Sequence, residues 1–232
     1  MDFIGQGFIK ALQLLLSGDK EVYSIALLTI KVSGTATLIS LILGVPMGLY
    51  FAVARFRGRE FMVGAVNAGM GLPPTVVGLW VALFFWRRGP LGFLGLMYTP
   101  AAMVIAQTII ALPLVAGLTM SAVQQLSPKL RLQILALGAS PLQFWWLILH
   151  EVRLGVLAAV MAGFGRVIAE VGASMAVGGN VRWYSRVLTT SIVLEVNKGN
   201  FSLALALSFI LLFISYGVTY WLTVLQQRRR QV

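Results

Sequence analysis

The sequence has little charge, a single histidine and no cysteine. Charged residues make up 11% and hydrophobic residues 59% of the 232 residues, whereas a typical soluble domain has about 25% charged residues. A chain of this size has too little interior to hide so much apolar surface from water. The lack of cysteine excludes disulfides, thiolate metal sites and thiol nucleophiles. The composition therefore predicts an integral membrane protein with no catalytic and no metal-binding residues.

Acidic residues are also scarce beside basic ones. The chain has 18 lysines and arginines against 7 aspartates and glutamates, which gives a net charge of +11. With a mean hydropathy of +0.88, this excess does not indicate a nucleic-acid-binding protein. We interpret the basic residues as loop anchors at a membrane surface. The first five residues lack a basic region, so we expect no cleaved signal peptide.

Long apolar runs dominate what the sequence does contain. A membrane-spanning helix needs about 20 apolar residues, and five segments meet this length, at about 22–54, 61–86, 98–123, 152–177 and 201–225. No strand-type alternation is present, so the predicted fold class is all-α integral membrane protein. Residues 1–21 hold a shorter apolar stretch, expected to form an interfacial helix, and residues 228–232 form a basic tail.

Five spans place the two termini on opposite sides of the membrane. If the basic tail is cytoplasmic, the loops on that side carry eight basic residues and the loops on the other side carry seven. Basic loop residues favour the cytoplasm, but so even a division leaves the orientation undecided by charge.

The segment between the third and fourth spans is unusually polar and contains clear signals for helix starts and helix ends. Ser127 and Pro128 are typical of a helix start, Gly138 of a helix end, and Ser140 with Pro141 of a second start. This pattern predicts a helix–turn–helix that projects from the membrane. A structured loop between two spans is the alternative.

Two features inside the spans need a physical explanation. Pro73 and Pro74 remove two backbone donors from an apolar run, which predicts either a kink satisfied by neighbouring helices or a break that exposes carbonyls and Thr75 to a transport path. Arg166 and Glu170 lie four residues apart, hence on one helix face. Such costly intramembrane charges are expected to form a structural ion pair or to line or gate a translocation path.

The polar hairpin resembles the cytoplasmic coupling loop of ABC importer permeases. The pattern of that family is Glu-Ala-Ala, three residues, Gly, nine residues, Ile, one residue, Leu-Pro. Gly138 matches its glycine and Ile148 its isoleucine, while Leu-Gln-Ile at 132–134 replaces Glu-Ala-Ala and His150-Glu151 replaces Leu-Pro. The missing acidic residue removes the usual polar contact to the ATPase but not the helix–turn–helix.

Other segments resemble the oxyanion group of the same family. Residues 71–79 are similar to the double-proline segment of molybdate, tungstate and sulfate permeases, and residues 163–174 to their fourth core helix. Residues 178–180 follow as in that group. The continuation over residues 186–201 looks most like the tungstate permeases. The resemblance covers about residues 24–225.

This resemblance implies a type I ABC importer transmembrane domain over residues 22–227, with about five core helices and a coupling loop at 127–148. It implies an importer for tungstate, with molybdate or sulfate as alternatives. The implied partners are ATPase subunits that hold ATP and Mg²⁺, an extracytoplasmic oxyanion-binding protein, and a second copy of the chain. No cofactor is expected in the chain itself, which has no phosphate-binding loop. The implied location is a prokaryotic inner membrane, with the N-terminus outside and the C-terminus in the cytoplasm.

The resemblance also assigns roles to residues. The residues expected to contact the ATPase are Leu135, Ala136, Leu137, Gly138, Ala139, Ser140 and Pro141. The residues expected to line or gate the translocation path are Pro73, Pro74, Thr75, Arg166, Glu170 and Ser174. Two other classes stay open at this point: a secondary transporter, which would be expected to show inverted repeats, and an integral-membrane enzyme using His150, Glu151 and Arg153.

Overall fold

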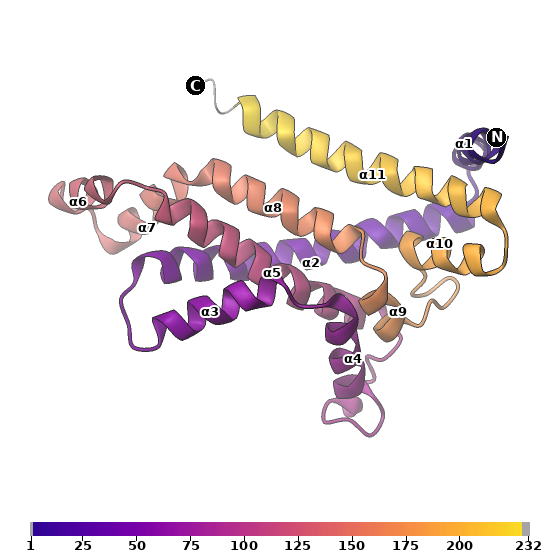
Figure 1. Ribbon diagram of the computed structural model, residues 1–232, viewed down its shortest axis with the longest axis horizontal. Helices are drawn as coiled ribbons and strands as arrows, with labels where there is room; N and C mark the ends of the chain where they lie inside the picture. Colours follow the sequence, from indigo (N-terminus) through magenta and orange to yellow (C-terminus); the bar gives the residue numbers. More distant parts are fainter. Residues whose placement is uncertain (1, 229–232) are drawn as a thin grey trace.

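The computed structural model describes residues 2–228, which form an elongated bundle of helices without strands (Figure 1). In chain order the helices are α1 (Asp2–Leu16), α2 (Lys20–Val53), α3 (Arg59–Met70), α4 (Pro74–Phe85), the 3₁₀ turn η1 (Gly92–Leu94), α5 (Pro100–Gln124), α6 (Pro128–Ala136), α7 (Pro141–Glu151), α8 (Arg153–Ile168), α9 (Gly172–Gly178), α10 (Leu188–Asn197) and α11 (Phe201–Arg228).

Three helices, α2, α5 and α11, are each long and apolar enough to cross a membrane. They match the first, third and fifth predicted spans to within a few residues. Two bent helix pairs, α3 with α4 and α7 with α8, raise the number to five if each pair is counted as one span. At 34 residues, α2 is about 51 Å long, well beyond the thickness of the hydrocarbon layer.

The second predicted span is broken at its two prolines, which was one of the two predictions for them, whereas the prediction of one continuous helix for the fourth span is wrong. Helices α3 and α4 meet at an angle of 105°, because Pro73 and Pro74 lack the N–H groups that would continue α3. In place of one helix over 152–177, α8 bends by 66° from α7 and ends at Ile168. The separate short helix α9 follows, and its first backbone donors need a partner other than α8.

The centre of the bundle is the long contact between α2 and α5. Glycines of α2 allow the two backbones to approach closely, since a Cβ on Gly48 would lie 2.5 Å from the Ala116 carbonyl oxygen. Small residues at such seams are the usual means of packing membrane helices. Around Val115 and Ala116 of α5, both fully buried, side chains of α2, α3, α7 and α8 form one apolar cluster. That cluster fixes the position of the polar hairpin described below.

Helix α1 packs across the first half of α11. The rings of Phe8 and Phe209 meet edge to face with centroids 5.4 Å apart, and Ala11 is buried. Figure 1 shows α1 nearly end-on while α11 lies in the plane of the picture, so the two helices cross. The predicted N-terminal helix is present, and its interfacial location stays a prediction. Of the predicted basic tail, residues 229–232 lie outside the described residues.

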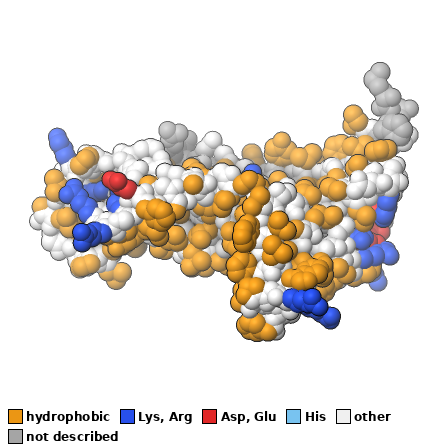
Figure 2. Space-filling model, turned by 60° about the horizontal axis from the view of Figure 1, so that its bottom comes forward, with side chains coloured by type: hydrophobic (Ala, Val, Ile, Leu, Met, Phe, Trp, Pro, Cys, Tyr) orange, Lys and Arg blue, Asp and Glu red, His pale blue; other side chains and the backbone are white. Residues whose placement is uncertain are grey.

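Basic side chains gather at the two ends of the long axis and at the tip of the projection that α4 forms (Figure 2). One end carries the α2–α3 loop, with its three arginines in residues 55–59, together with α6 and α7. The opposite end carries the α1–α2 turn and the α9–α10 loop. An apolar middle between two charged ends is the arrangement expected of a membrane-spanning protein.

Candidate functional site

The predicted helix–turn–helix is formed by α6 and α7 at one end of the molecule (Figure 1). The side chain of Ser127 accepts a hydrogen bond from the Lys129 N–H at 3.3 Å at the start of α6. At the start of α7, the Ser140 hydroxyl accepts from the Gln143 N–H, and the Gln143 side chain accepts from the Ser140 N–H at 2.8 Å. This reciprocal capping box fixes the beginning of α7 and confirms both predicted helix starts.

The turn between the two helices depends on Gly138. Its φ of +75° lies in the left-handed region, which residues with a Cβ adopt only at a cost. The tip around it is open: Leu137 is 87% exposed and Leu135 57%. Of the seven residues expected to contact the ATPase, only Ala139 is partly covered and the others are exposed. The hairpin thus presents an apolar, solvated tip with a rigid turn.

The base of the hairpin is part of the protein core. Ile148 is completely buried, and Phe144 and Ile134 are buried with it in the cluster around α5. The Arg131 guanidinium donates at 3.1 Å to the Val123 carbonyl oxygen at the C-terminal end of α5, which also accepts from the Leu126 N–H. A structured loop that merely connects two spans would not need these contacts. The base of the hairpin is therefore anchored in the same apolar cluster as α5.

A second site lies where α4 meets α9. A Cβ placed on Gly172 would lie 2.5 Å from the methyl group of Thr75, and a Cβ on Gly78 would lie 2.6 Å from the Ala173 Cα. These distances show that the backbones of α4 and α9 touch at their N-terminal turns. The two interrupted spans therefore cross at their interruptions. Such paired breaks are the usual setting of transporter binding sites.

Glu170 stabilises this crossing by capping α9. Its Oε1 accepts a hydrogen bond from the Ala173 N–H at 2.9 Å, and its carbonyl oxygen accepts from the Thr189 hydroxyl at 3.0 Å. Glu170 is 7% exposed, whereas Arg166 is exposed and forms no salt bridge within residues 2–228. The predicted Arg166–Glu170 ion pair is wrong because α8 ends between them, so that they share no helix face.

The other predicted path residues divide between surface and interior. Pro73 and Thr75 are exposed, while Ser174 is buried against α5. There the Ser174 hydroxyl accepts a hydrogen bond from the side-chain Nε2 of Gln107 at 3.2 Å. The side-chain oxygen Oε1 of Gln107 has no partner among the described residues. The structure thus brings Thr75, Glu170 and Ser174 to one crossing and leaves Arg166 outside it.

Two buried residues at the crossing were missed by the sequence analysis. Gln107 is the one amide inside the apolar run of α5, and Thr189 is 5% exposed in the first turn of α10. A lone amide in a spanning helix is a detectable signal, since buried polar groups in membranes need a partner. Thr189 offered no such signal, because its partner is a backbone carbonyl 19 residues away.

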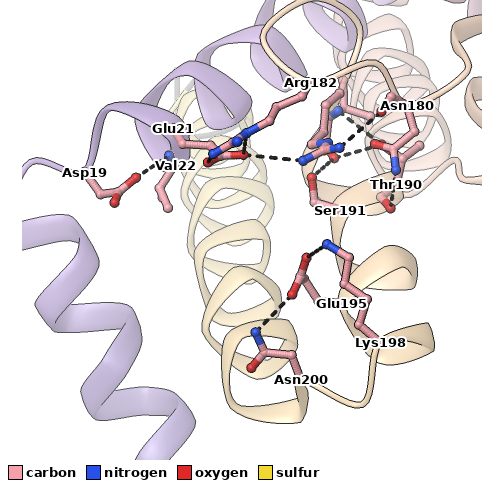
Figure 3. Close-up of polar contacts among 12 residues, drawn as sticks. Asp19, Glu21, Val22, Asn180, Arg182, Thr190, Ser191, Glu195, Lys198 and Asn200 are labelled. Carbon is pink, nitrogen blue, oxygen red and sulfur yellow. Dashed lines mark hydrogen bonds and ion pairs between the residues drawn. The ribbon is translucent and has the colours of Figure 1, made fainter.

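A polar cluster occupies the opposite end of the molecule from the hairpin (Figure 3). Glu21 of α2 binds two arginines of the α9–α10 loop, Arg182 at 2.5 Å and Arg186 at 3.4 Å. Hydrogen bonding to the Glu21 carboxylate raises the pKa of the Arg182 guanidinium. Lys198 and Asn200 bind Glu195 at 2.9 and 3.0 Å. An open cavity of about 520 Å³ is lined by Glu21, Arg182, Arg186, Glu195 and Lys198.

These sites consist of apolar side chains and hydrogen-bonded polar groups. No group of three metal-ligating side chains occurs within the described residues, and His150 is engaged by Arg153 at 2.7 Å and stacks on Trp146. A crossing of two broken helices, a projecting helix–turn–helix and several apolar spans are the arrangement expected of a membrane-embedded transport subunit.

The comparisons with known proteins agree with this class. Residues 44–231 match the family model described as binding-protein-dependent transport system inner membrane component, and the chain belongs to this family. Its members are non-catalytic ABC transporter permease subunits, so the predictions of a permease rather than an enzyme and of a multi-pass inner-membrane protein are confirmed. Family membership also implies ATPase and substrate-binding protein partners.

Curated relatives cover almost the whole chain. The chain is 39% identical over 227 residues to the tungstate uptake system permease protein TupB of Peptoclostridium acidaminophilum, covering 98% of this chain and 100% of that protein. It is 34% identical to the protein of the same name from Campylobacter jejuni, covering 95% and 92% of the two chains. The resemblance to oxyanion permeases noted in the sequence is thereby confirmed.

The fold is similar to that of a solved ABC importer. The inward-facing MetNI methionine ABC transporter superposes with a TM-score of 0.67 at 18% identity, over 90% of this chain and 92% of that one. At this identity the likeness concerns the fold alone. It confirms the predicted all-α transmembrane domain of the type I ABC importers.

Proposed function

We propose that the chain is the permease subunit of an ATP-driven importer that moves tungstate across the inner membrane. The observation that carries the proposal is 39% identity over 98% of the chain to a tungstate uptake permease. Molybdate and sulfate are the alternative substrates, because all three are tetrahedral oxyanions of the same charge. The substrate reaches the permease from an extracytoplasmic binding protein.

The α6–α7 hairpin is the proposed contact with the ATPase. Its exposed leucines, Leu135 and Leu137, offer an apolar tip on a turn that Gly138 fixes. Movement of the tip would pass directly into α5, because Ile148 and Phe144 are packed in the same cluster. ATP and Mg²⁺ belong to the ATPase in this proposal, and the permease contributes a rigid lever.

The crossing of α4 and α9 is the proposed translocation site. Pro73, Pro74 and Thr75 lie on its accessible side, and Arg166 is an exposed cation near the end of α8. Glu170 and Ser174 are assigned a supporting role, since both are buried and hydrogen bonded. Because the exposed residues are the ones free to meet the anion, we expect brief contacts at the surface of the path and no buried binding pocket. A transport path needs such weak contacts, since it must release its ion.

A second copy of the chain is the proposed partner across the pathway. The α3–α4 segment exposes large apolar side chains, among them Phe61 at 78%, Trp80 at 60% and Leu79 at 56%. An exposed apolar surface beside a broken-helix crossing fits an interface between two permease subunits. The N-terminus is proposed to lie outside and the hairpin in the cytoplasm, which leaves the Glu21–Arg182–Arg186 cluster facing the binding protein.

The test is the ATPase activity of the reconstituted complex with its binding protein. Activity is titrated separately with tungstate, molybdate, sulfate and phosphate. We expect stimulation at the lowest concentration by tungstate. Stimulation by none of the four anions, or transport by this chain without an ATPase, would contradict the proposal. Stimulation by sulfate or molybdate at lower concentrations than tungstate would support the corresponding alternative.

A further inference from the structure

We propose that the groove between the C-terminal half of α2 and helix α7 binds an anionic phospholipid. The groove has a volume of about 560 Å³ and is lined only by apolar and aromatic residues. Its floor contains Val45 and Leu49, both buried. Its walls are formed by Tyr50 from α2 and by Leu142 and Trp146 from α7, which are 48%, 81% and 61% exposed.

An exposed apolar stripe leads from the groove along α2. Leu38, Ile42, Pro46 and Tyr50 follow one another at four-residue spacing, hence on one helix face, and all four are exposed. The stripe covers about 18 Å of helix and runs toward the middle of the longest span. In a bilayer this face is met by acyl chains, so the groove continues a surface that already contacts lipid.

Cationic side chains do not line the groove but lie beyond each wall, next to residues that contact it. Trp146 stacks on His150 with ring centroids 5.2 Å apart, and the Arg153 guanidinium donates to the His150 ring at 2.7 Å. On the other wall, Tyr50 stacks on Phe56 at 5.4 Å, and the neighbours of Phe56 in the chain are two exposed arginines, Arg55 and Arg57. The only acidic neighbour on α7 is the exposed Glu151.

This combination matches a phospholipid with a negative headgroup. Tryptophan and tyrosine collect at the level of the headgroups, and basic residues beside an apolar groove bind anionic lipid headgroups. The apolar groove suits an acyl chain and the cations suit a phosphate. A water-soluble anion would leave the groove empty, and a zwitterionic lipid would gain less from the cations because its ammonium group offsets the charge of its phosphate.

Occupancy has a structural consequence for α7. Leu49 and Val45 on one side and Trp145 on the other pack into the same apolar cluster, but the space between α2 and α7 is left unfilled within the described residues. A lipid in this space would connect the two helices. It would support the base of the hairpin that Gly138 turns.

The experiment is native mass spectrometry of the full permease–ATPase complex in nanodiscs of equal phosphatidylglycerol and phosphatidylcholine. We expect the complex to retain phosphatidylglycerol in preference to phosphatidylcholine. The substitution Arg153→Gln should lower this preference about fivefold, because one cation fewer near the membrane surface weakens the binding of an anionic lipid by about that factor. Arg87→Gln, at an exposed position in the α4–η1 loop, is the matched control. Trp146→Ala is expected to lower retention of both lipids, and Trp221→Ala, equally exposed at 62% on α11, to leave it unchanged.

A second measurement distinguishes a lipid from a second protein copy. Because the chain has no cysteine, Leu142→Cys introduces a unique thiol at the groove. Reaction with a lipid-soluble maleimide supports the proposal, whereas a disulfide-linked dimer in high yield would assign the groove to a protein interface. Equal retention of the two lipids, or equal effects of Trp146→Ala and Trp221→Ala, would also overturn it. Neither measurement needs transport or substrate, so failure here leaves the proposed function untouched.

Discussion

Replacement of Gly138 by proline tests whether the hairpin is a rigid lever. Gly138 has φ of +75°, whereas proline fixes φ near −65°, so the two arms α6 and α7 would have to take a new relative direction. The glycine N–H also donates to the Leu135 carbonyl oxygen at 3.0 Å, and proline removes this donor. A Cβ at Gly138 meets nothing within 4 Å, so the whole effect comes from the backbone.

The size of the effect on ATPase association should depend on which residue replaces Gly138. Alanine at Gly138 pays only for the left-handed backbone, about 1–2 kcal/mol, while asparagine tolerates this conformation better. We therefore expect ATPase association to fall in the order Gly, Asn, Ala, Pro, with loss of uptake for proline. The assay is co-purification of the tagged permease with the ATPase, followed by tungstate uptake in vesicles. Membrane insertion is expected to stay normal, since Ile148 and Phe144 still anchor α7.

Gly199 provides a matched control at the other end of the molecule. Its φ is +74°, nothing lies within 4 Å of its Cβ position, and its N–H donates to the Val196 carbonyl oxygen at 2.9 Å. Gly199→Pro is thus the same backbone perturbation in the α10–α11 turn. It is expected to leave ATPase association intact. Normal association of Gly138→Pro, or equal loss in both variants, would refute the assignment of docking to the hairpin.

Three further predictions concern stability, measured as the thermal midpoint of the purified permease. Glu170→Gln keeps an acceptor for the Ala173 N–H and should change little, whereas Glu170→Ala removes the cap and should cost about 0.5–2 kcal/mol; equal effects would contradict the capping role. Gly48→Ala forces a methyl group against the backbone of α5 and should cost about 1–3 kcal/mol, while Gly34→Ala in the same helix meets open space and should be neutral or stabilising. Arg182→Gln should leave the midpoint unchanged, because its ion pair is exposed; a clear loss would show that the pair is better shielded than its exposure indicates.

Local signals in the sequence predicted the hairpin well. Ser127, Gly138 and Ser140 act through bonds to residues two or three positions away, so their pattern determines the structure directly. The long helices α2, α5 and α11 were predicted for a similar reason, since each contains one long apolar stretch. The helix boundaries that are set by residues close together in the chain are therefore the part of this fold that can be predicted from the sequence.

Contacts between distant segments could not be predicted in this way. Arg166 and Glu170 share a helix face only if the helix continues, and it ends at Ile168 because the Glu170 side chain caps α9 instead. Glu21 meets Arg182 across 161 residues, and Gln107 meets Ser174 across 67. Their pairing depends on how α2, α5 and α9 are arranged in space, which no local pattern contains.

The hairpin and the crossing of the broken spans are connected through α5. At the hairpin end, Val123 of α5 is fully buried and its carbonyl oxygen binds Arg131. Further along the same helix, Gln107 binds Ser174 of α9 beside the capped break. Helix α5 is continuous over residues 100–124, although Pro113 lies between these two contacts, whereas α3–α4 and α8–α9 are broken. A displacement of the hairpin therefore has one continuous helix along which to reach the crossing, where it meets the two broken segments.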